Sequence, residues 1–170
     1  MRRLSIALLL LAACAEDPLA LAPFPCADDG TCPASLTCAA GLGDDGAAVC
    51  LPECASSLDC EDGWSCAAVG AANACMQECT PFGTDCVGAT TCRIEPASDQ
   101  GYTATCLAVR GGQDMFGACA SSLDCPGNAS CARASEAEPF TCRPHCDAAH
   151  DCHRGMTCQP LLPSGAGVCL

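Results

Sequence analysis

Cysteine is the residue type in this chain with the most chemistry open to it. There are 21 cysteines among 170 residues, and thiols at this density form disulfides or bind zinc. The heptapeptide CASSLDC at residues 54–60 is repeated letter for letter at residues 119–125. In both copies a third cysteine follows after five further residues, at Cys66 and Cys131. This spacing indicates a repeated structural unit.

The same unit occurs five times. Looser C-x5-C-x5-C patterns begin at Cys26 and Cys146, and one with an additional residue begins at Cys79. A fourth cysteine closes each set 9 to 14 positions later. The five sets of four use every cysteine except Cys14.

Disulfides explain these cysteines better than zinc does. Zinc usually takes ligands at C-x2-C or C-x4-C spacing, and neither spacing occurs here. Disulfides at this density persist only outside the cytosol. Four cysteines allow three connectivities, and the spacing alone does not choose among them. Closing a loop of the length between first and third cysteines stabilises a fold by roughly 3 kcal/mol.

The elements that position these cysteines must be small, because large apolar residues are too scattered for one continuous core. We therefore expect small disulfide-rich modules: five tandem four-cysteine repeats with turns and short β-hairpins, such as those around residues 64–69 and 90–95. An aspartate precedes the second cysteine in four repeats, at Asp59, Asp85, Asp124 and Asp151. We expect this aspartate to close a turn by accepting hydrogen bonds from the amides of residues just before it in the chain. A calcium site would need several carboxylates in one loop.

The N-terminus has the composition of a secretory signal. Arg2 and Arg3 precede a ten-residue apolar run, Leu4 to Ala13, too short to span a bilayer as a helix. Residues 11–14, Leu-Ala-Ala-Cys, resemble the bacterial lipobox. That resemblance implies cleavage before Cys14, a diacylglyceryl group on its thiol and fatty acylation such as palmitate on its amine. The alternative is ordinary cleavage after Ala15. The other twenty cysteines pair completely among the five repeats, so a Cys14 left in the mature chain has no partner, and a lipid is the natural use for it.

The C-x5-C-x5-C pattern with its aspartate is similar to part of the whey-acidic-protein four-disulfide core, and has a likeness to the Dickkopf N-terminal Cys-rich region. It also resembles Cys-rich repeats of bacterial lipoproteins. The resemblance implies that the first cysteine pairs with the third and the second with the fourth. The implied pairs are Cys26–Cys38, Cys32–Cys50, Cys54–Cys66, Cys60–Cys75, Cys79–Cys92, Cys86–Cys106, Cys119–Cys131, Cys125–Cys142, Cys146–Cys158 and Cys152–Cys169.

These patterns divide the chain into a leader, a tether and five repeats. A Gly-Gly pair between the third and fourth repeats indicates a hinge. The expected segments are a signal peptide (1–13), the lipidated cysteine and tether (14–25), repeats at 26–53, 54–78 and 79–106, the hinge (107–118), and repeats at 119–145 and 146–170.

The remaining residues favour binding over catalysis. The chain has 20 acidic residues against seven arginines, which disfavours nucleic acid as a partner. His145, His150 and His153 are weak candidates for a metal site. We find no nucleophile or phosphate-loop motif, and expect neither a cofactor nor enzymatic activity.

We expect a binding, adhesion or spacer protein anchored by lipid in the outer membrane, facing the periplasm or the cell surface, with a protein or glycan as possible ligand. An aspartate at residue 15 would favour retention in the inner membrane, and residue 15 is alanine. The alternative is a secreted protease inhibitor or ligand array, although the third-to-fourth cysteine loops share no specificity residue.

Overall fold

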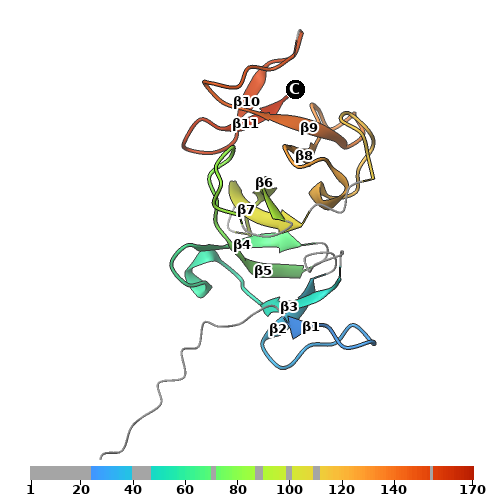
Figure 1. The fold of residues 1–170 in the computed structure, drawn as a ribbon, viewed down its shortest axis with the longest axis vertical. Helices are drawn as coiled ribbons and strands as arrows, with labels where there is room; N and C mark the ends of the chain where they lie inside the picture. The colour runs from blue at the N-terminus through green and yellow to red at the C-terminus, as the bar shows by residue number, and fades with distance from the viewer. Residues whose placement is uncertain are drawn as a thin grey trace, which may run out of the picture.

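The computed structural model describes residues 24–39, 47–69, 72–86, 90–98, 101–108, 112–153 and 155–170. The described residues contain β-strands and two short 3-10 turns. The first three repeats follow one another along the long axis of the molecule, and the last two lie side by side at its far end (Figure 1). The elements are β1 (Phe24–Pro25), β2 (Leu36–Ala39), β3 (Val49–Pro52), η2 (Ser57–Asp59), β4 (Trp64–Val69), β5 (Ala72–Gln77), β6 (Thr90–Pro96), β7 (Tyr102–Ala108), η3 (Ser122–Asp124), β8 (Ala129–Ala132), β9 (Thr141–Cys146), β10 (Cys158–Pro160) and β11 (Gly167–Cys169). The prediction of small disulfide-rich modules with short hairpins is confirmed.

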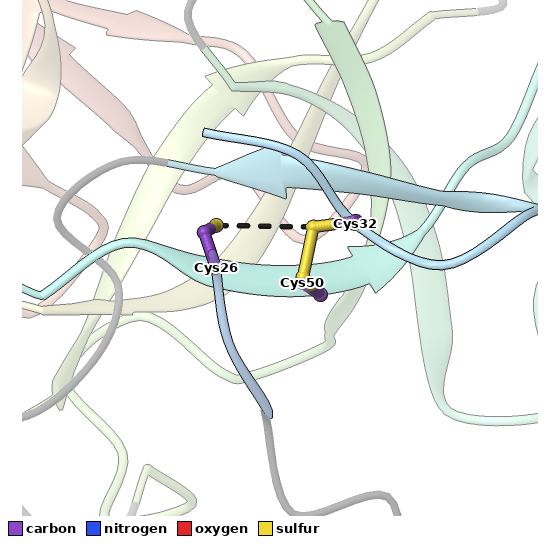
Figure 2. Close-up of side chains that lie close together, drawn as sticks. All are labelled: Cys26, Cys32 and Cys50. Carbon is purple, nitrogen blue, oxygen red and sulfur yellow. Dashed lines mark hydrogen bonds between the residues drawn. A yellow bond between two sulfur atoms is a disulfide. The ribbon is translucent and has the colours of Figure 1, made fainter. Parts of the chain in front are cut away.

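Each repeat is built on one antiparallel hairpin whose strands carry its third and fourth cysteines. These two cysteines are direct cross-strand partners in every repeat, as Cys66 and Cys75 are in the hairpin of β4 and β5. Neighbouring positions on one face of a hairpin bring side chains together. The first and second cysteines approach this face, so the two disulfides of a repeat lie side by side. Figure 2 shows the Cys32–Cys50 disulfide of the first repeat beside Cys26, which is bonded to Cys38; the sulfurs of Cys26 and Cys32 are 3.8 Å apart.

The residue before the first cysteine adds one more backbone pairing to each hairpin. In all five repeats the residue before the first cysteine pairs with the residue before the fourth: Pro25 with Val49, Glu53 with Ala74, Glu78 with Thr105, Ala118 with Thr141, and His145 with Val168. In the second, third and fifth repeats, only three residues separate this first cysteine from the last cysteine of the preceding repeat. In the fifth repeat this pairing makes β9 of the fourth repeat part of the same sheet. In the second and third repeats it is a single bridge from the end of the preceding hairpin.

A shared apolar cluster adds to these backbone links. Its members are small and medium-sized side chains of the first four repeats: Ala39, Val49, Leu51, Ala67, Val69, Ala74, Met76, Leu107 and Leu123. Sequence alone indicated no continuous core, because apolar residues are sparse within any one repeat. The repeats instead combine them across their interfaces.

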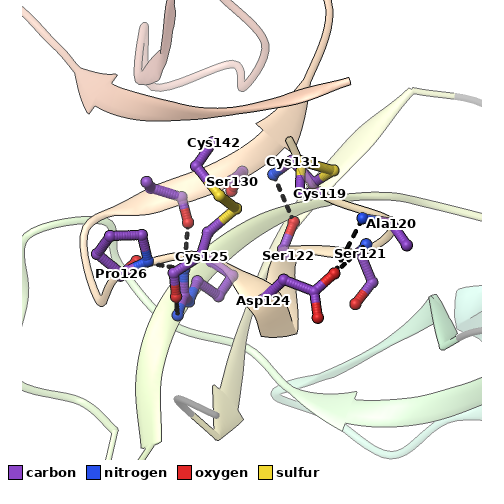
Figure 3. The surroundings of a disulfide bond; sticks show 12 residues. Cys119, Ala120, Ser121, Ser122, Asp124, Cys125, Pro126, Ser130, Cys131 and Cys142 are labelled. Atoms are coloured by element: carbon purple, nitrogen blue, oxygen red, sulfur yellow. Dashed lines mark hydrogen bonds between the residues drawn. A yellow bond between two sulfur atoms is a disulfide. The ribbon is translucent and has the colours of Figure 1, made fainter. Parts of the chain in front are cut away.

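Aspartate closes the turn that carries the second cysteine, as expected. The Asp124 Oδ2 atom accepts hydrogen bonds from the amides of Ala120 (2.9 Å) and Ser121 (3.1 Å), which Figure 3 shows beside the two disulfides of the fourth repeat. In the second repeat, Asp59 accepts hydrogen bonds from the equivalent amides of Ala55 and Ser56. In the third, Asp85 accepts one from the amide of Thr80 at 2.8 Å.

The fifth repeat closes its turn differently from the prediction. There Asp147, directly after the first cysteine, accepts hydrogen bonds from the amides of Ala149 and His150, both at 2.8 Å. An aspartate at the start of a loop can accept hydrogen bonds from the amides of the second and third residues that follow it in the chain. This position therefore takes over the role that the sequence assigned to Asp151.

The structure shortens the expected hinge. Leu107 and Ala108 are buried residues of β7. At the other end, the Phe116 amide donates to the Cys142 carbonyl at 2.8 Å, so this part of the segment is bound to the fourth repeat. Residues 109–111 lie outside the described residues, as do Cys14, the signal peptide and all but the last two residues of the tether.

Candidate functional site

The ten disulfides of the structure use all twenty cysteines of the repeats. Cα atoms of the bonded cysteines lie 5.3 to 5.9 Å apart, within the usual range. The pairs are first-to-third and second-to-fourth in every repeat, the arrangement that the whey-acidic-protein resemblance implies: Cys26–Cys38, Cys32–Cys50, Cys54–Cys66, Cys60–Cys75, Cys79–Cys92, Cys86–Cys106, Cys119–Cys131, Cys125–Cys142, Cys146–Cys158 and Cys152–Cys169.

The sulfur clusters of the repeats are structural. Three sulfurs in each repeat lie within 4.8 Å of one another, close enough to share a metal ion. A metal binds the thiolate form of cysteine, and a sulfur bonded to another sulfur is not a thiolate. With the disulfides formed, these clusters act as crosslinks.

The three histidines do not form one site. His145 is buried on β9, with its Nε2 atom 2.8 Å from the Ser130 hydroxyl. His150 is exposed, bonds Asp147 through Nδ1 at 2.8 Å and stacks on the Phe82 ring with centroids 3.8 Å apart. Among the described residues, the groups placed closely enough to hold a metal consist of cysteines alone.

Arg93 on β6 connects the third repeat to the fourth. Its side chain is fully buried, and its guanidinium donates to the backbone carbonyls of Cys125 (2.8 Å), Pro126 and Ala129. Burial lowers the pKa of Arg93 to about 10, an effect that the nearby Glu95 carboxylate opposes. The fourth repeat thus places three carbonyl oxygens around one cation, a geometry well suited to the planar guanidinium.

Two neighbours of Arg93 extend this network. The Ile94 amide donates to the Ser130 hydroxyl at 3.1 Å, which joins β6 to His145 at the end of the fourth repeat. Burial raises the pKa of Glu95 to about 7, and a hydrogen bond with Ser122 and the charge of Arg93 oppose the rise. Polar contacts in the low-dielectric interior therefore hold the third and fourth repeats together. The pairing of β11 with β9 joins the fifth repeat to the fourth.

These contacts leave a cleft between the last three repeats. Its volume is about 520 Å³, and its walls are mostly apolar, which fits the size and lining of binding sites for small molecules or single side chains. All three repeats contribute to its lining, which includes Ile94 and Tyr102 from the third repeat, Arg133 and Phe140 from the fourth, and Leu161 and Val168 from the fifth.

Two aromatic rings of this cleft are accessible to solvent. Tyr102 is 45% exposed and Phe140 is 46% exposed. The Arg133 guanidinium lies over the Phe140 ring, 4.9 Å from its centroid, a cation–π contact that orients the ring. The cleft therefore combines two large apolar contact surfaces with one positively charged residue, Arg133, and one negatively charged residue, Glu136.

Sequence reasoning did not identify Arg93, Tyr102 or Phe140 as site residues. A comparison of equivalent positions offers a signal for Arg93, because the residue after the third cysteine is Ala39, Ala67, Arg93, Ala132 and Gln159 in the five repeats. Only the third repeat carries a charge there. Tyr102 and Phe140 lie in third-to-fourth cysteine segments that vary from repeat to repeat, and their convergence depends on the packing of three repeats.

The chain matches no protein-family model, no curated protein and no solved structure at a significant level. No helix in the described part of the chain is long and apolar enough to cross a membrane.

Proposed function

We propose that this chain is a lipid-anchored, extracytoplasmic binding protein of the outer membrane. In this proposal Cys14 carries the lipid, the segment after it is the tether, and the disulfide-linked repeats present a ligand-binding surface. The observation that carries the binding role is the cleft of the last three repeats, with Tyr102 and Phe140 half exposed in it. Exposed aromatic rings in a concave site supply large contact area at small cost in conformational entropy.

The ligand class follows from the walls of the cleft. An apolar side chain of a protein ligand or the apolar face of a sugar fits between the rings, with Arg133 available for a hydrogen bond. The lining of the cleft includes Ser130, whose hydroxyl lies 2.8 Å from His145 Nε2. Ser130 is buried and its oxygen also accepts the hydrogen bond of the Ile94 amide. We therefore propose a binding role for the cleft and assign it no catalytic step.

The proposal is tested by presenting the whole oxidised chain, kept in detergent, to arrays of glycans and of proteins. The variant carries Tyr102→Ala and Phe140→Ala together. We expect it to bind the array ligand at least about tenfold more weakly, the size of effect typical of a truncated aromatic anchor.

Phe116 provides the matched control. It is 42% exposed and does not line the cleft, so Phe116→Ala should bind as the unaltered chain does. Equal binding by the cleft variant would reject the site. The absence of any ligand on both arrays would favour the spacer role.

A further inference from the structure

The two CASSLDC heptapeptides adopt one local structure in two different environments. The residue that caps the 3-10 turn has nearly the same backbone conformation in both: φ −150° and ψ 167° at Ser56, φ −150° and ψ 166° at Ser121. Their leucines differ completely in exposure, since Leu58 is 95% exposed and Leu123 is 8% exposed. The difference must lie in what covers each turn.

The third repeat covers the turn of the fourth. Leu123 packs in the shared apolar cluster with Leu107, Arg93 donates to the Cys125 carbonyl, and Glu95 is hydrogen-bonded to Ser122. The same heptapeptide is thus a docking element within this chain.

Among the described residues, nothing covers the turn of the second repeat in this way. In the first repeat, alanine stands at position 39, where the third repeat has Arg93. Leu58 therefore presents its side chain outward. An exposed large apolar side chain indicates an interaction surface when other binding features lie next to it.

An apolar pocket lies next to this turn. It has a volume of about 150 Å³ and is lined by Leu36, Leu51 and Pro52 of the first repeat, Trp64 of the second, and Asp59 and Glu61 at its rim. An apolar cavity of this size accommodates a benzene-sized group, so it fits one leucine or phenylalanine side chain.

Charge identifies the kind of partner. Residues 26–78 contain no arginine, lysine or histidine, and they contain nine acidic residues: Asp28, Asp29, Asp44, Asp45, Glu53, Asp59, Glu61, Asp62 and Glu78. The five arginines after Arg3 all lie beyond residue 78. Asp59 and Glu61 line the pocket itself, so a second copy of this acidic pocket is repelled, whereas a cationic partner is attracted and steered to it.

We propose that Leu58 and the adjoining pocket lined by Leu36 and Trp64 form a docking face for a basic polypeptide segment that carries an apolar side chain. The apolar side chain enters the pocket, Leu58 packs against the segment, and its lysines or arginines face the surrounding carboxylates. This face lies in the first two repeats and shares no residue with the cleft of the last three.

The test is selection of a phage-displayed library of random twelve-residue peptides on the whole oxidised chain in detergent. Enriched peptides should carry a net positive charge and a leucine, isoleucine or phenylalanine. They should bind the Leu58→Ser variant about tenfold more weakly, as expected for loss of an apolar anchor. Their affinity should also fall as salt is raised, because exposed charges are screened.

The variant with Tyr102→Ala and Phe140→Ala is the control, and it should bind the enriched peptides normally. Loss of binding in that variant would assign the peptides to the cleft and overturn the docking face. Equal binding to Leu58→Ser, enrichment of neutral or acidic peptides, or no enrichment would overturn it as well. Leu58 is almost fully exposed, so Leu58→Ser should unfold at the same denaturant concentration as the unaltered chain.

Discussion

At the scale of single residues, the unusual feature is a buried arginine held by backbone carbonyls. Arg93→Met keeps an apolar stem but removes the donors that satisfy the carbonyls of Cys125, Pro126 and Ala129. Unpaired buried acceptors are costly, and removal of a buried charged partner typically costs 3–5 kcal/mol. We expect a loss of roughly 3–5 kcal/mol in the free energy of unfolding, measured by urea denaturation with the disulfides intact.

Arg133→Met is the control for this measurement. This substitution also removes a cation, but the main contact of Arg133 is with the half-exposed Phe140 ring. A cation–π contact at an exposed site contributes about 0.5–1 kcal/mol. The role assigned to Arg93 fails if the two variants are equally stable.

Glu95 and His145 make opposing contributions to the pH dependence of stability. The pKa of Glu95 is raised to about 7, so the folded state holds this proton more tightly than the unfolded state and stability falls as pH rises from about 4.5 to 7. Burial, with the charge of Arg93, lowers the pKa of His145 to about 4. Folding therefore releases this proton, and stability rises between about pH 4 and 6.5.

The two slopes offset each other where they overlap, and single substitutions should expose them. We expect Glu95→Gln to become more stable as pH rises from 4.5 to 6.5, and His145→Asn to become less stable over the same range. Each change should reach about 3 kcal/mol at most. Urea denaturation at a series of pH values measures both slopes, and parallel curves for the two variants would contradict the prediction.

At the scale of elements, the duplicated turn allows a comparison within one chain. We expect Leu123→Ala to cost about 2–4 kcal/mol in the free energy of unfolding, because it leaves a cavity in the apolar cluster. Leu58→Ala should change this free energy by no more than about 0.5 kcal/mol, the range for exposed positions. Urea denaturation of both variants provides the measurement, and similar losses would show that the two turns are covered alike.

The same turn shows what could be predicted from the sequence. Asp59 and Asp124 follow local rules, so their role in turn closure was accessible from spacing alone. The hairpin at residues 64–69 was likewise predicted. The contrast between Leu58 and Leu123 was not, because identical local sequences carry no information on which neighbouring repeat covers them. The cleft depends in the same way on contacts between repeats, made by Arg93 and its partners.

At the scale of the whole molecule, the ten disulfides close within repeats and none joins the first three repeats to the last two. Arg110 is a trypsin site in the Gly-rich linker, and we expect the first cut there. The two fragments should separate on a non-reducing denaturing gel. They should remain together in native gel filtration, because the contacts of Arg93 hold them, and should come apart when Arg93→Met is present. A nicked chain that stays intact on the non-reducing gel would reveal a disulfide across the linker.

Lipidation of Cys14 concerns the whole molecule because it sets where every repeat works. The reasons are the basic residues Arg2 and Arg3, the short apolar run, the small residues before Cys14, and the pairing that occupies the other twenty cysteines. We expect the mature N-terminal peptide to carry diacylglycerol and fatty acid, as measured by mass spectrometry, since more than one chain is needed for stable anchoring. Cys14→Ala should move the protein out of the membrane fraction or block its processing, while all ten disulfides still form. An unmodified mature N-terminus at Glu16 would instead mean cleavage after Ala15 and secretion, and the inhibitor interpretation would then deserve equal weight.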